Sequence, residues 1–137
     1  IRPGRNPRQP GARLANAQVQ LHTMSNLSNL ITALIAVESS GNDQAIGDNG
    51  RAVGPLQIHR AVVLDVNKFT GSHYRHQDMT NRAQARAVCQ AYLEHYGRGK
   101  SLEEQARIWN GGPQGHKKTV TLTYWRKIEA QLKKGSK

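Results

Sequence analysis

Two carboxylates, Glu38 and Asp48, have the types and positions that acid–base chemistry needs. Leucine and isoleucine recur at spacings of three and four over residues 26–39, which predicts an amphipathic helix with one apolar face. The same spacing, stepped forward from Ile31 or Leu34, reaches Glu38. Burial raises the pKa of an acid, and a general acid must carry its proton near neutral pH. The alternative is a helix-end glutamate turned to solvent beside Ser39–Gly41. The apolar face comprises Leu27, Leu30, Ile31, Leu34 and Ile35.

Asp48 lies ten residues after Glu38, in a segment rich in Asn, Asp and Gly. The sequence Asp48-Asn-Gly50 is typical of a tight turn, and short strands on either side would form a small hairpin. A helix-end acid and a hairpin acid can face each other across a groove. One would be held among apolar groups and the other in a polar setting, as glycoside hydrolysis requires. The alternative is that Asp48 serves only the turn.

Three further stretches offer groups that could position a substrate. In Gly54-Pro-Leu-Gln-Ile58, the amide of Gln57 stands beside Ile58 and must find hydrogen bonds, in a ligand or in its own loop. Trp109-Asn-Gly-Gly-Pro113 offers a ring, the Asn110 amide and the bare backbone of Gly111, or else an ordinary helix stop. Tyr124 offers a stacking face or packs in the core. His73 and His76 lack the acids or cysteines of a metal site, so we expect neither metal nor cofactor.

The helical and turn signals predict a mainly α domain with one small β hairpin beside a buried central helix. Residues 1–22 read as a basic arm with a possible short helix over 12–22, and residues 23–137 as the folded domain. The first two predicted helices are 26–39, with Ser25 as its N-cap, and 59–67. A third is capped by Thr80 and ended by Gly97. The last two are 101–109, opened by the capping box Ser101–Glu104, and 119–134, with Val120 pointing inward. In the helix between Thr80 and Gly97, the predicted inner stripe comprises Ala83, Ala87, Ala91 and His95, with Val88 and Tyr92 alongside.

Length, charge and cysteine content narrow the possible classes. A chain of 137 residues with 20 Lys and Arg against nine Asp and Glu has a formal net charge of +11. The length suits one domain, and the charge suits an anionic partner such as a wall polymer, a nucleic acid or an anionic membrane surface. The single cysteine, Cys89, excludes an intrachain disulfide and is expected to be a small buried thiol. No apolar run has transmembrane length.

Four ordered motifs resemble those of the invertebrate-type (destabilase-like) lysozymes. They are Glu38-Ser-Ser-Gly41, Gly47-Asp-Asn-Gly50, Gly54-Pro-Leu-Gln-Ile58, and Ala106-Arg-Ile-Trp-Asn-Gly-Gly-Pro-Gln-Gly115 followed by Tyr124-Trp-Arg-Lys-Ile128. The resemblance covers about Leu27 to Ile128 and implies an α+β lysozyme-like fold. It also implies that Glu38 is the general acid and Asp48 the second carboxylate. The implied substrate is the β-1,4 bond between N-acetylmuramic acid and N-acetylglucosamine in peptidoglycan.

Two departures from the family bear on the mechanism. Animal members are rich in disulfides and this chain has none, which favours a bacterial or phage-type relative. The spacing from Asp48 to Gly54-Pro55 is also one residue shorter than the family pattern. The motifs are similar as well to those of soluble lytic transglycosylases, which need no second carboxylate and leave a 1,6-anhydro sugar.

Asp48 favours hydrolysis over transglycosylation. We therefore expect a bacteriolytic muramidase that cleaves peptidoglycan, binds anionic wall polymers, and is periplasmic, secreted or phage-associated. Glu38 and Asp48 would be catalytic, and six residues would contact substrate: Gln57, Ile58, Trp109, Asn110, Gly111 and Tyr124. A non-catalytic basic binder of cell wall or nucleic acid is a further alternative, and in the enzyme any nucleic-acid binding would be non-specific.

Overall fold

The computed structural model describes residues 26–135, which are helical from the first described position. Residues 26–39 form the expected helix, and Leu30 and Leu34 on its apolar face have no exposed surface. The helix prediction is therefore confirmed. Ser25, the short helix over 12–22 and the basic arm lie outside the described residues.

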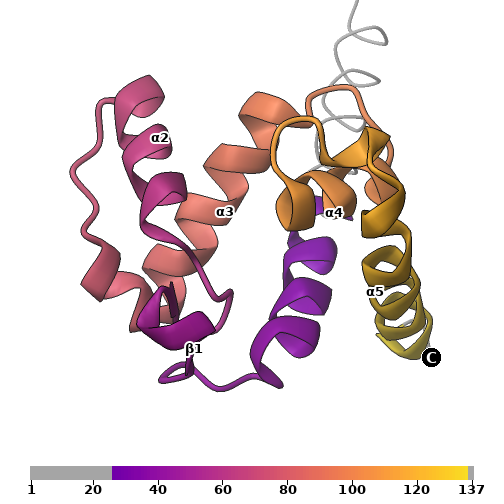
Figure 1. The fold of residues 1–137 in the computed structure, drawn as a ribbon, viewed down its shortest axis with the longest axis horizontal. Helices are drawn as coiled ribbons and strands as arrows, with labels where there is room; N and C mark the ends of the chain where they lie inside the picture. Colours follow the sequence, from indigo (N-terminus) through magenta and orange to yellow (C-terminus); the bar gives the residue numbers. More distant parts are fainter. Residues whose placement is uncertain (1–25, 136–137) are drawn as a thin grey trace, which may run out of the picture.

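The remaining elements follow one another through short connections (Figure 1). Their bounds are β1 Ile46–Gly47, η1 Asp48–Gly50, β2 Ala52–Val53, α2 Arg60–Thr70, η2 His76–Thr80, α3 Arg82–Tyr96, α4 Leu102–Gly111, η3 Gly115–Lys117, η4 Thr119–Thr121 and α5 Leu122–Gly135, where η marks a 3₁₀ turn. The fold is mainly α with one two-stranded sheet, as the sequence predicts. None of the helices described is long and apolar enough to cross a membrane.

The hairpin forms where the sequence predicts it. β1 and β2 pair antiparallel, with Ile46 opposite Val53 and Gly47 opposite Ala52. Asp48 and Asn49 take positive φ values of 50° and 58°, so the tight turn is built from left-handed residues.

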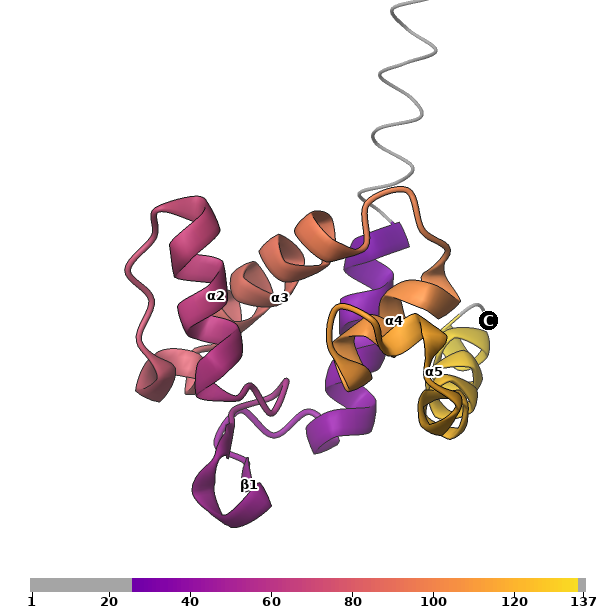
Figure 2. The ribbon, with the colours of Figure 1, turned by 45° about the horizontal axis from the view of Figure 1, so that its top comes forward.

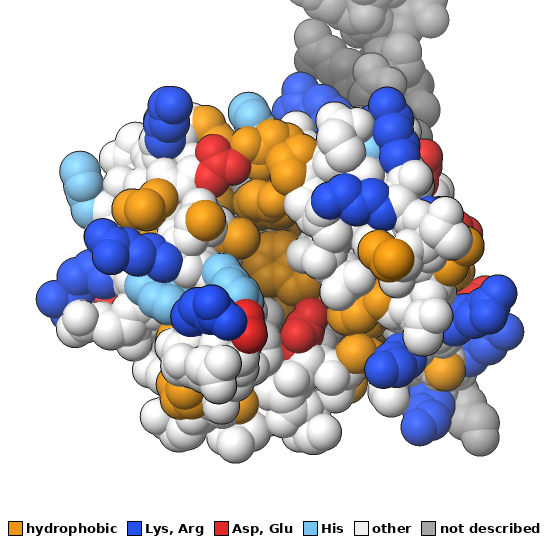
Figure 3. All heavy atoms as spheres, in the orientation of Figure 1, with side chains coloured by type: hydrophobic (Ala, Val, Ile, Leu, Met, Phe, Trp, Pro, Cys, Tyr) orange, Lys and Arg blue, Asp and Glu red, His pale blue; other side chains and the backbone are white. Residues whose placement is uncertain are grey.

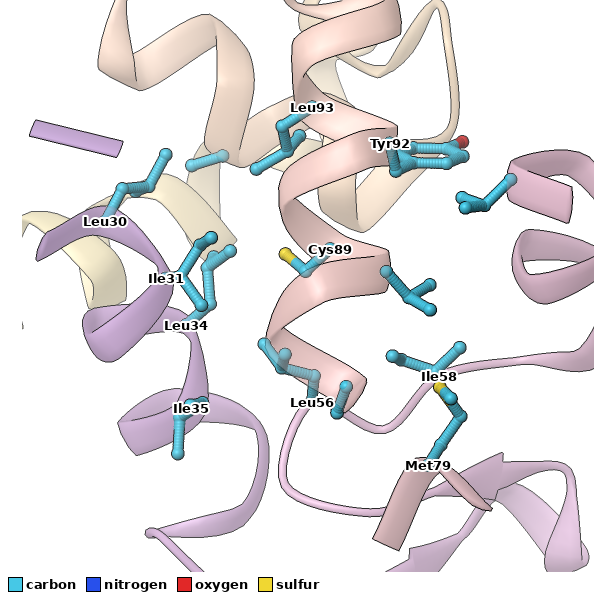
Figure 4. Packing of buried hydrophobic residues seen from close by; sticks show 14 of the residues in the cluster. Leu30, Ile31, Leu34, Ile35, Leu56, Ile58, Met79, Cys89, Tyr92 and Leu93 are labelled. Carbon is cyan, nitrogen blue, oxygen red and sulfur yellow. The ribbon is translucent and has the colours of Figure 1, made fainter. Parts of the chain in front are cut away.

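A long helix, α3, divides the molecule. In Figures 1 and 2, the hairpin and α2 lie on one side of α3, and the 26–39 helix, α4 and α5 lie on the other. Figure 4 shows the apolar face of the 26–39 helix turned toward α3, where Cys89 lies between the two. Cys89 is fully buried, as expected for a small core thiol. The core on both sides of α3 holds the two halves at fixed positions.

Several helix details differ from the sequence prediction. α2 continues to Thr70, because Gly71 supplies the left-handed cap with φ 75°. α3 is capped by Asn81, whose side chain accepts a hydrogen bond from the Gln84 backbone N–H, and not by Thr80. Ser101 and Glu104 form the predicted capping box at the start of α4.

The inner stripe predicted for α3 is wrong at both ends. Ala83 and His95 are exposed. The buried face of the helix instead comprises Ala85, Val88, Cys89, Tyr92 and Leu93. Alanines occur on both faces of α3, so their spacing does not reveal which face meets the core. Val120, predicted to point inward from the last helix, is 80% exposed because it belongs to η4, before α5 begins.

Candidate active site

Glu38 lies in the last turn of the 26–39 helix and is half-buried. The hydroxyl of Tyr124, on α5, donates a hydrogen bond of 2.6 Å to Glu38 Oε2. This bond joins residues 86 positions apart and fixes one carboxyl oxygen. Glu38, which the spacing of leucine and isoleucine places on the apolar face, is thus partly desolvated at the edge of the core.

The surroundings of Glu38 favour its protonated form. Burial raises the pKa of this carboxyl, and the hydrogen bond from Tyr124 opposes that rise without cancelling it. Tyr124 remains a donor, because burial and the nearby Glu38 carboxylate both raise the pKa of its hydroxyl. A raised pKa in a half-buried carboxyl is the property required of a general acid near neutral pH.

Asp48 occupies a different environment, on the exposed turn of the hairpin. Its Oδ1 is 3.1 Å from an Arg51 guanidinium nitrogen, and its Oδ2 is 3.2 Å from Nε2 of His59. Arg51 also donates to the Asp48 backbone carbonyl at 3.1 Å. Both carboxylate oxygens are therefore engaged by groups that bear or can bear positive charge, and His59 links the hairpin to the start of α2.

Gln57 braces the loop that carries Asp48. Its Nε2 donates to the carbonyls of Ala45, at 3.1 Å, and Gly54, at 3.0 Å. A Cβ on Gly47 would stand 2.3 Å from Oε1 of this side chain, so the amide packs against bare backbone. The amide nitrogen is thus directed at the loop backbone, and Oε1 packs against Gly47.

Ile58 is built into the same loop by its backbone. Its side chain is 1% exposed, and its N–H and C=O both bond Val53. The Ile58 carbonyl also accepts a 2.7 Å bond from Nε2 of His76, which must be the donor because a carbonyl can only accept. This residue therefore holds the loop in place and offers a ligand no free polar group.

Backbone strain is concentrated between Glu38 and α2. All four described non-glycine residues with positive φ lie there: Ser40, Asp48, Asn49 and Gln57. Such conformations cost about 1–3 kcal/mol each and persist where the surrounding contacts impose them, which is often at functional sites.

The predicted residues of α4 lie on its last turn. Trp109 is half-buried and meets Tyr92 edge to face, with ring centroids 5.6 Å apart. Asn110 is exposed, so its amide is accessible. The Gly111 carbonyl accepts a 2.8 Å bond from Lys118 Nζ, and a Cβ at this glycine would lie 2.7 Å from the Thr121 side chain.

A hollow crosses the face of the molecule shown in Figure 3. Compared with Figure 1, it lies between the hairpin and α2 on one side and the 26–39 helix and α4 on the other, with α3 behind it. The floor of the hollow is hydrophobic (Figure 3). Acidic side chains lie on its margin. Apart from Tyr124 on α5, the candidate residues therefore come from elements and loops that border one concave surface with an apolar floor.

Contacts between α2 and α3 were not predicted from the sequence. Tyr96 donates a 2.5 Å hydrogen bond to Oδ2 of Asp65, and Phe69 and Tyr92 both contact the Tyr96 ring. The spacing of four between Tyr92 and Tyr96 was a signal that these rings share one helix face. Asp65 gave no such signal, because its partner lies 31 residues away.

No group of three or more His, Cys, Asp or Glu side chains that could hold a metal ion occurs within residues 26–135. Cys89 is inert as well, since full burial raises the pKa of its thiol well above the ordinary value.

Comparison with known proteins gives two kinds of match. Residues 16–132 match the family model described as "Transglycosylase SLT domain". The chain is 36% identical over 88 residues to Lysozyme 1 of Crassostrea virginica, which covers 61% of this chain and 46% of that protein. It is 33% identical over 107 residues to a lysozyme of Ostrea edulis, covering 74% of this chain and 77% of that protein. The chain thus spans less than half of one oyster lysozyme and about three quarters of the other.

Proposed function

Since the chain belongs to the family of transglycosylase SLT domains, within the lysozyme and transglycosylase superfamily, we propose that it cleaves the glycan strands of peptidoglycan. The bond cut is the β-1,4 linkage between N-acetylmuramic acid and N-acetylglucosamine. The observation that carries this proposal is the half-buried Glu38 carboxyl, whose pKa is raised by burial and whose Oε2 is held by Tyr124.

Glu38 acts as the general acid. The proton on Oε1 passes to the glycosidic oxygen as the C1–O bond breaks, and the sugar left behind develops oxocarbenium character. Tyr124 keeps Oε2 in place and stabilises the carboxylate that remains. That carboxylate then takes a proton from the water that attacks C1, which restores the acid for the next turnover.

Asp48 serves as an electrostatic stabiliser in this scheme. Arg51 and His59 engage its two oxygens, so the carboxylate is held at a fixed position instead of being free to attack C1. A fixed negative charge near a developing oxocarbenium ion lowers the energy of the transition state. Trp109 and Asn110, at the end of α4, remain the proposed contacts for the sugar.

Transglycosylation is the second candidate, and the engagement of Asp48 is the observation that favours it. An enzyme of this kind needs no second carboxylate, because the substrate's acetamido group assists the departure and the muramoyl 6-hydroxyl closes a 1,6-anhydro ring. Mass spectrometry of the products separates the two routes, since anhydro ends are one water lighter than reducing ends. A Glu38→Gln variant tests what both routes share.

Glu38→Gln keeps the size of the side chain and removes the transferable proton. We expect clearing of a purified peptidoglycan suspension to fall by at least about a thousandfold, while sedimentation with the same material is unchanged. Clearing at the wild-type rate would refute the catalytic assignment. Asp48→Asn then bears on the route: a rate within about threefold of wild type favours transglycosylation, and a loss of about a hundredfold favours hydrolysis.

The basic charge fits this substrate. A net charge of +11 attracts the chain to anionic wall polymers, and it attracts nucleic acid only without sequence preference. We propose that the protein acts on the wall from the periplasm, after secretion or as part of a phage. If wild-type protein sedimented with peptidoglycan but released no fragments, the chain would be a non-catalytic cell-wall binder.

A further inference from the structure

One guanidinium group connects α4 to the segment that leads into α5. The two helices are in contact on the same side of α3 (Figures 1 and 2). Arg107 lies near the middle of α4, and its side chain is only 12% exposed. Its Nε donates to Oγ1 of Thr121 at 2.8 Å, and its Nη2 donates to the Lys118 carbonyl at 3.1 Å. Its Nη1 donates to Oε2 of Glu103 at 3.0 Å, so all three guanidinium nitrogens are bonded.

Thr121 is the buried partner in this contact. It has no exposed surface, and its Oγ1 lies 2.8 Å from the Gly115 carbonyl oxygen and 2.7 Å from that of Lys118. A hydroxyl has one proton, so it donates to these carbonyls while its oxygen accepts from Arg107. Gly115 packs on the backbone of α4, because a Cβ there would stand 2.1 Å from the Arg107 carbonyl oxygen. The segment before α5 is therefore held to α4 by both backbone and side chains.

The position of Thr121 sets where α5 begins. The turn η4 ends at Thr121, and α5 starts at the next residue, Leu122. Tyr124 follows Thr121 by three residues, which is about one helical turn. The Tyr124 hydroxyl is 2.6 Å from Oε2 of Glu38. A displacement of α5 by about 1 Å would therefore lengthen this contact beyond hydrogen-bonding distance.

We propose that Arg107 is a positioning residue, which acts through Thr121 to hold the Tyr124 hydroxyl against Glu38. Arg107 takes no part in the proton transfer itself. The inference rests on the proposed function, because it concerns the general acid of that reaction. It assigns to a guanidinium on α4 the alignment of an acid on one helix with a hydrogen-bond donor on another.

The pH dependence of cleavage reports whether Tyr124 stays in place. The bond from Tyr124 lowers the pKa of Glu38, against the effect of burial, so loss of the bond leaves that pKa higher. A general acid is active below its pKa, so the alkaline fall in kcat/KM then moves to higher pH. On α3, Cys89 stays neutral because burial raises the pKa of its thiol, and Glu38 forms no ion pair within residues 26–135.

The test compares pH profiles for cleavage of a soluble, peptide-free octasaccharide of peptidoglycan by full-length wild type, Arg107→Lys, Thr121→Val and Tyr124→Phe. Lysine keeps the charge beside Glu103 but lacks the planar fork that bonds Thr121 and Lys118 together. Valine keeps the shape of threonine and removes its hydroxyl. We expect each variant to lose about tenfold in kcat/KM at the wild-type optimum. The alkaline fall should lie at higher pH than in wild type in all three.

A double variant and a rescue variant distinguish positioning from a purely structural role. Adding Arg107→Lys to Tyr124→Phe should move the alkaline fall no further, because the bond to Glu38 is already absent. Thr121→Ser keeps the hydroxyl and should restore the wild-type profile. A purely structural role for Arg107 would lower Tm and leave the alkaline fall at the wild-type pH.

Arg86 on α3 provides a matched control. Its Nη1 donates to Oγ1 of Thr32 at 3.1 Å, and its Nη2 donates to the Ser28 carbonyl at 3.0 Å. This guanidinium also connects two helices, but it reaches the start of the 26–39 helix, ten residues before Glu38 in the case of Ser28. We expect Arg86→Lys to keep the wild-type pH profile.

The outcomes separate this inference from the proposed function. Failure of the wild type to cleave any strand overturns the proposed function and this inference with it. Wild-type cleavage with an unmoved alkaline fall in Arg107→Lys and Thr121→Val overturns the inference alone. If Thr121→Val does not fold, Arg107→Lys decides the question, because it retains the positive charge beside Glu103.

Discussion

At the scale of single residues, the site depends on one carboxyl group held in an environment that suits its neutral form. Burial raises the pKa of Glu38 and the bond from Tyr124 limits the rise. The Glu38 carboxyl can therefore stay protonated at a pH at which an exposed glutamate would have ionised. This property has a cost in stability, because the folded state holds the group in surroundings that disfavour its charge.

Glu38→Gln should therefore stabilise the protein in a pH-dependent way. The folded-state pKa lies above the unfolded value of 4.5, so the folded state keeps the proton while the unfolded chain loses it. The contribution of Glu38 to the stability of the wild type falls as pH rises from 4.5 through the folded pKa and is level above it. We expect Tm of Glu38→Gln to match wild type near pH 4 and to exceed it at pH 8. Parallel Tm curves at all pH values would show that the Glu38 carboxyl is not desolvated.

The residue-scale predictions from the sequence agree with the structure where local sequence supplied the information. The periodic leucines predicted Glu38 on the apolar face, where the structure has it half-buried, and Asp48-Asn-Gly50 predicted the turn that Asp48 occupies. Tyr124 was recognised as a candidate but not as the partner of Glu38, because their contact joins positions 86 apart. The sequence left open whether the Gln57 amide bonds a ligand or its own loop. Its bonds to the carbonyls of Ala45 and Gly54 depend on the folded backbone and could not be predicted.

At the scale of elements, the loop between the hairpin and α2 depends on a glycine. Gly54 has φ of 84°, and a Cβ there would stand 1.8 Å from the carbonyl oxygen of Met79. The hairpin therefore packs on the η2 backbone at a distance that only glycine allows. This close approach positions Asp48 and Gln57 relative to the core.

Gly54→Ala should unfold at much lower urea than wild type. The expected loss is about 3 kcal/mol or more, because the methyl group forces the hairpin away from η2. Gly71→Ala is the control: its φ of 75° is also left-handed, but nothing lies within 4 Å of the added Cβ. The free energy of unfolding of that variant should fall by about 1 kcal/mol, because only the conformational cost of the left-handed alanine remains. Equal losses in the two urea titrations would show that contact with Met79 is not limiting.

Helix ends show what local sequence can and cannot specify. The capping box of α4 was predicted correctly, because both hydrogen bonds lie within Ser101–Glu104. The cap of α3 is Asn81 and not Thr80, one residue further on, since Thr and Asn side chains can both serve as N-caps. The buried face of α3 was misassigned because alanines carry too little apolar surface to mark an inner face.

At the scale of the whole molecule, the fold class followed from the sequence, whereas the hollow did not. Helix and hairpin signals are local, so the mainly α domain with one hairpin was predictable. Ring contacts join Phe69, Tyr92, Tyr96 and Trp109 across three helices. Which faces of those helices meet is set by packing between distant segments, and no spacing within one helix specifies it.

The net charge of the whole chain should govern how fast it reaches an intact wall. With +11 charges, approach to an anionic surface is accelerated at low salt, and the Debye length falls from about 30 Å at 0.01 M to about 3 Å at 1 M salt. We expect the initial rate of wall clearing to drop severalfold between 0.02 and 0.5 M NaCl. Walls stripped of their anionic polymers serve as the control and should show a much weaker dependence. Replacing Arg2, Arg5, Arg8 and Arg13 by Gln leaves a charge of +7 and should reduce the salt dependence on intact walls. If the clearing rate did not change with salt on either kind of wall, the charge of the chain would not govern its association with the wall.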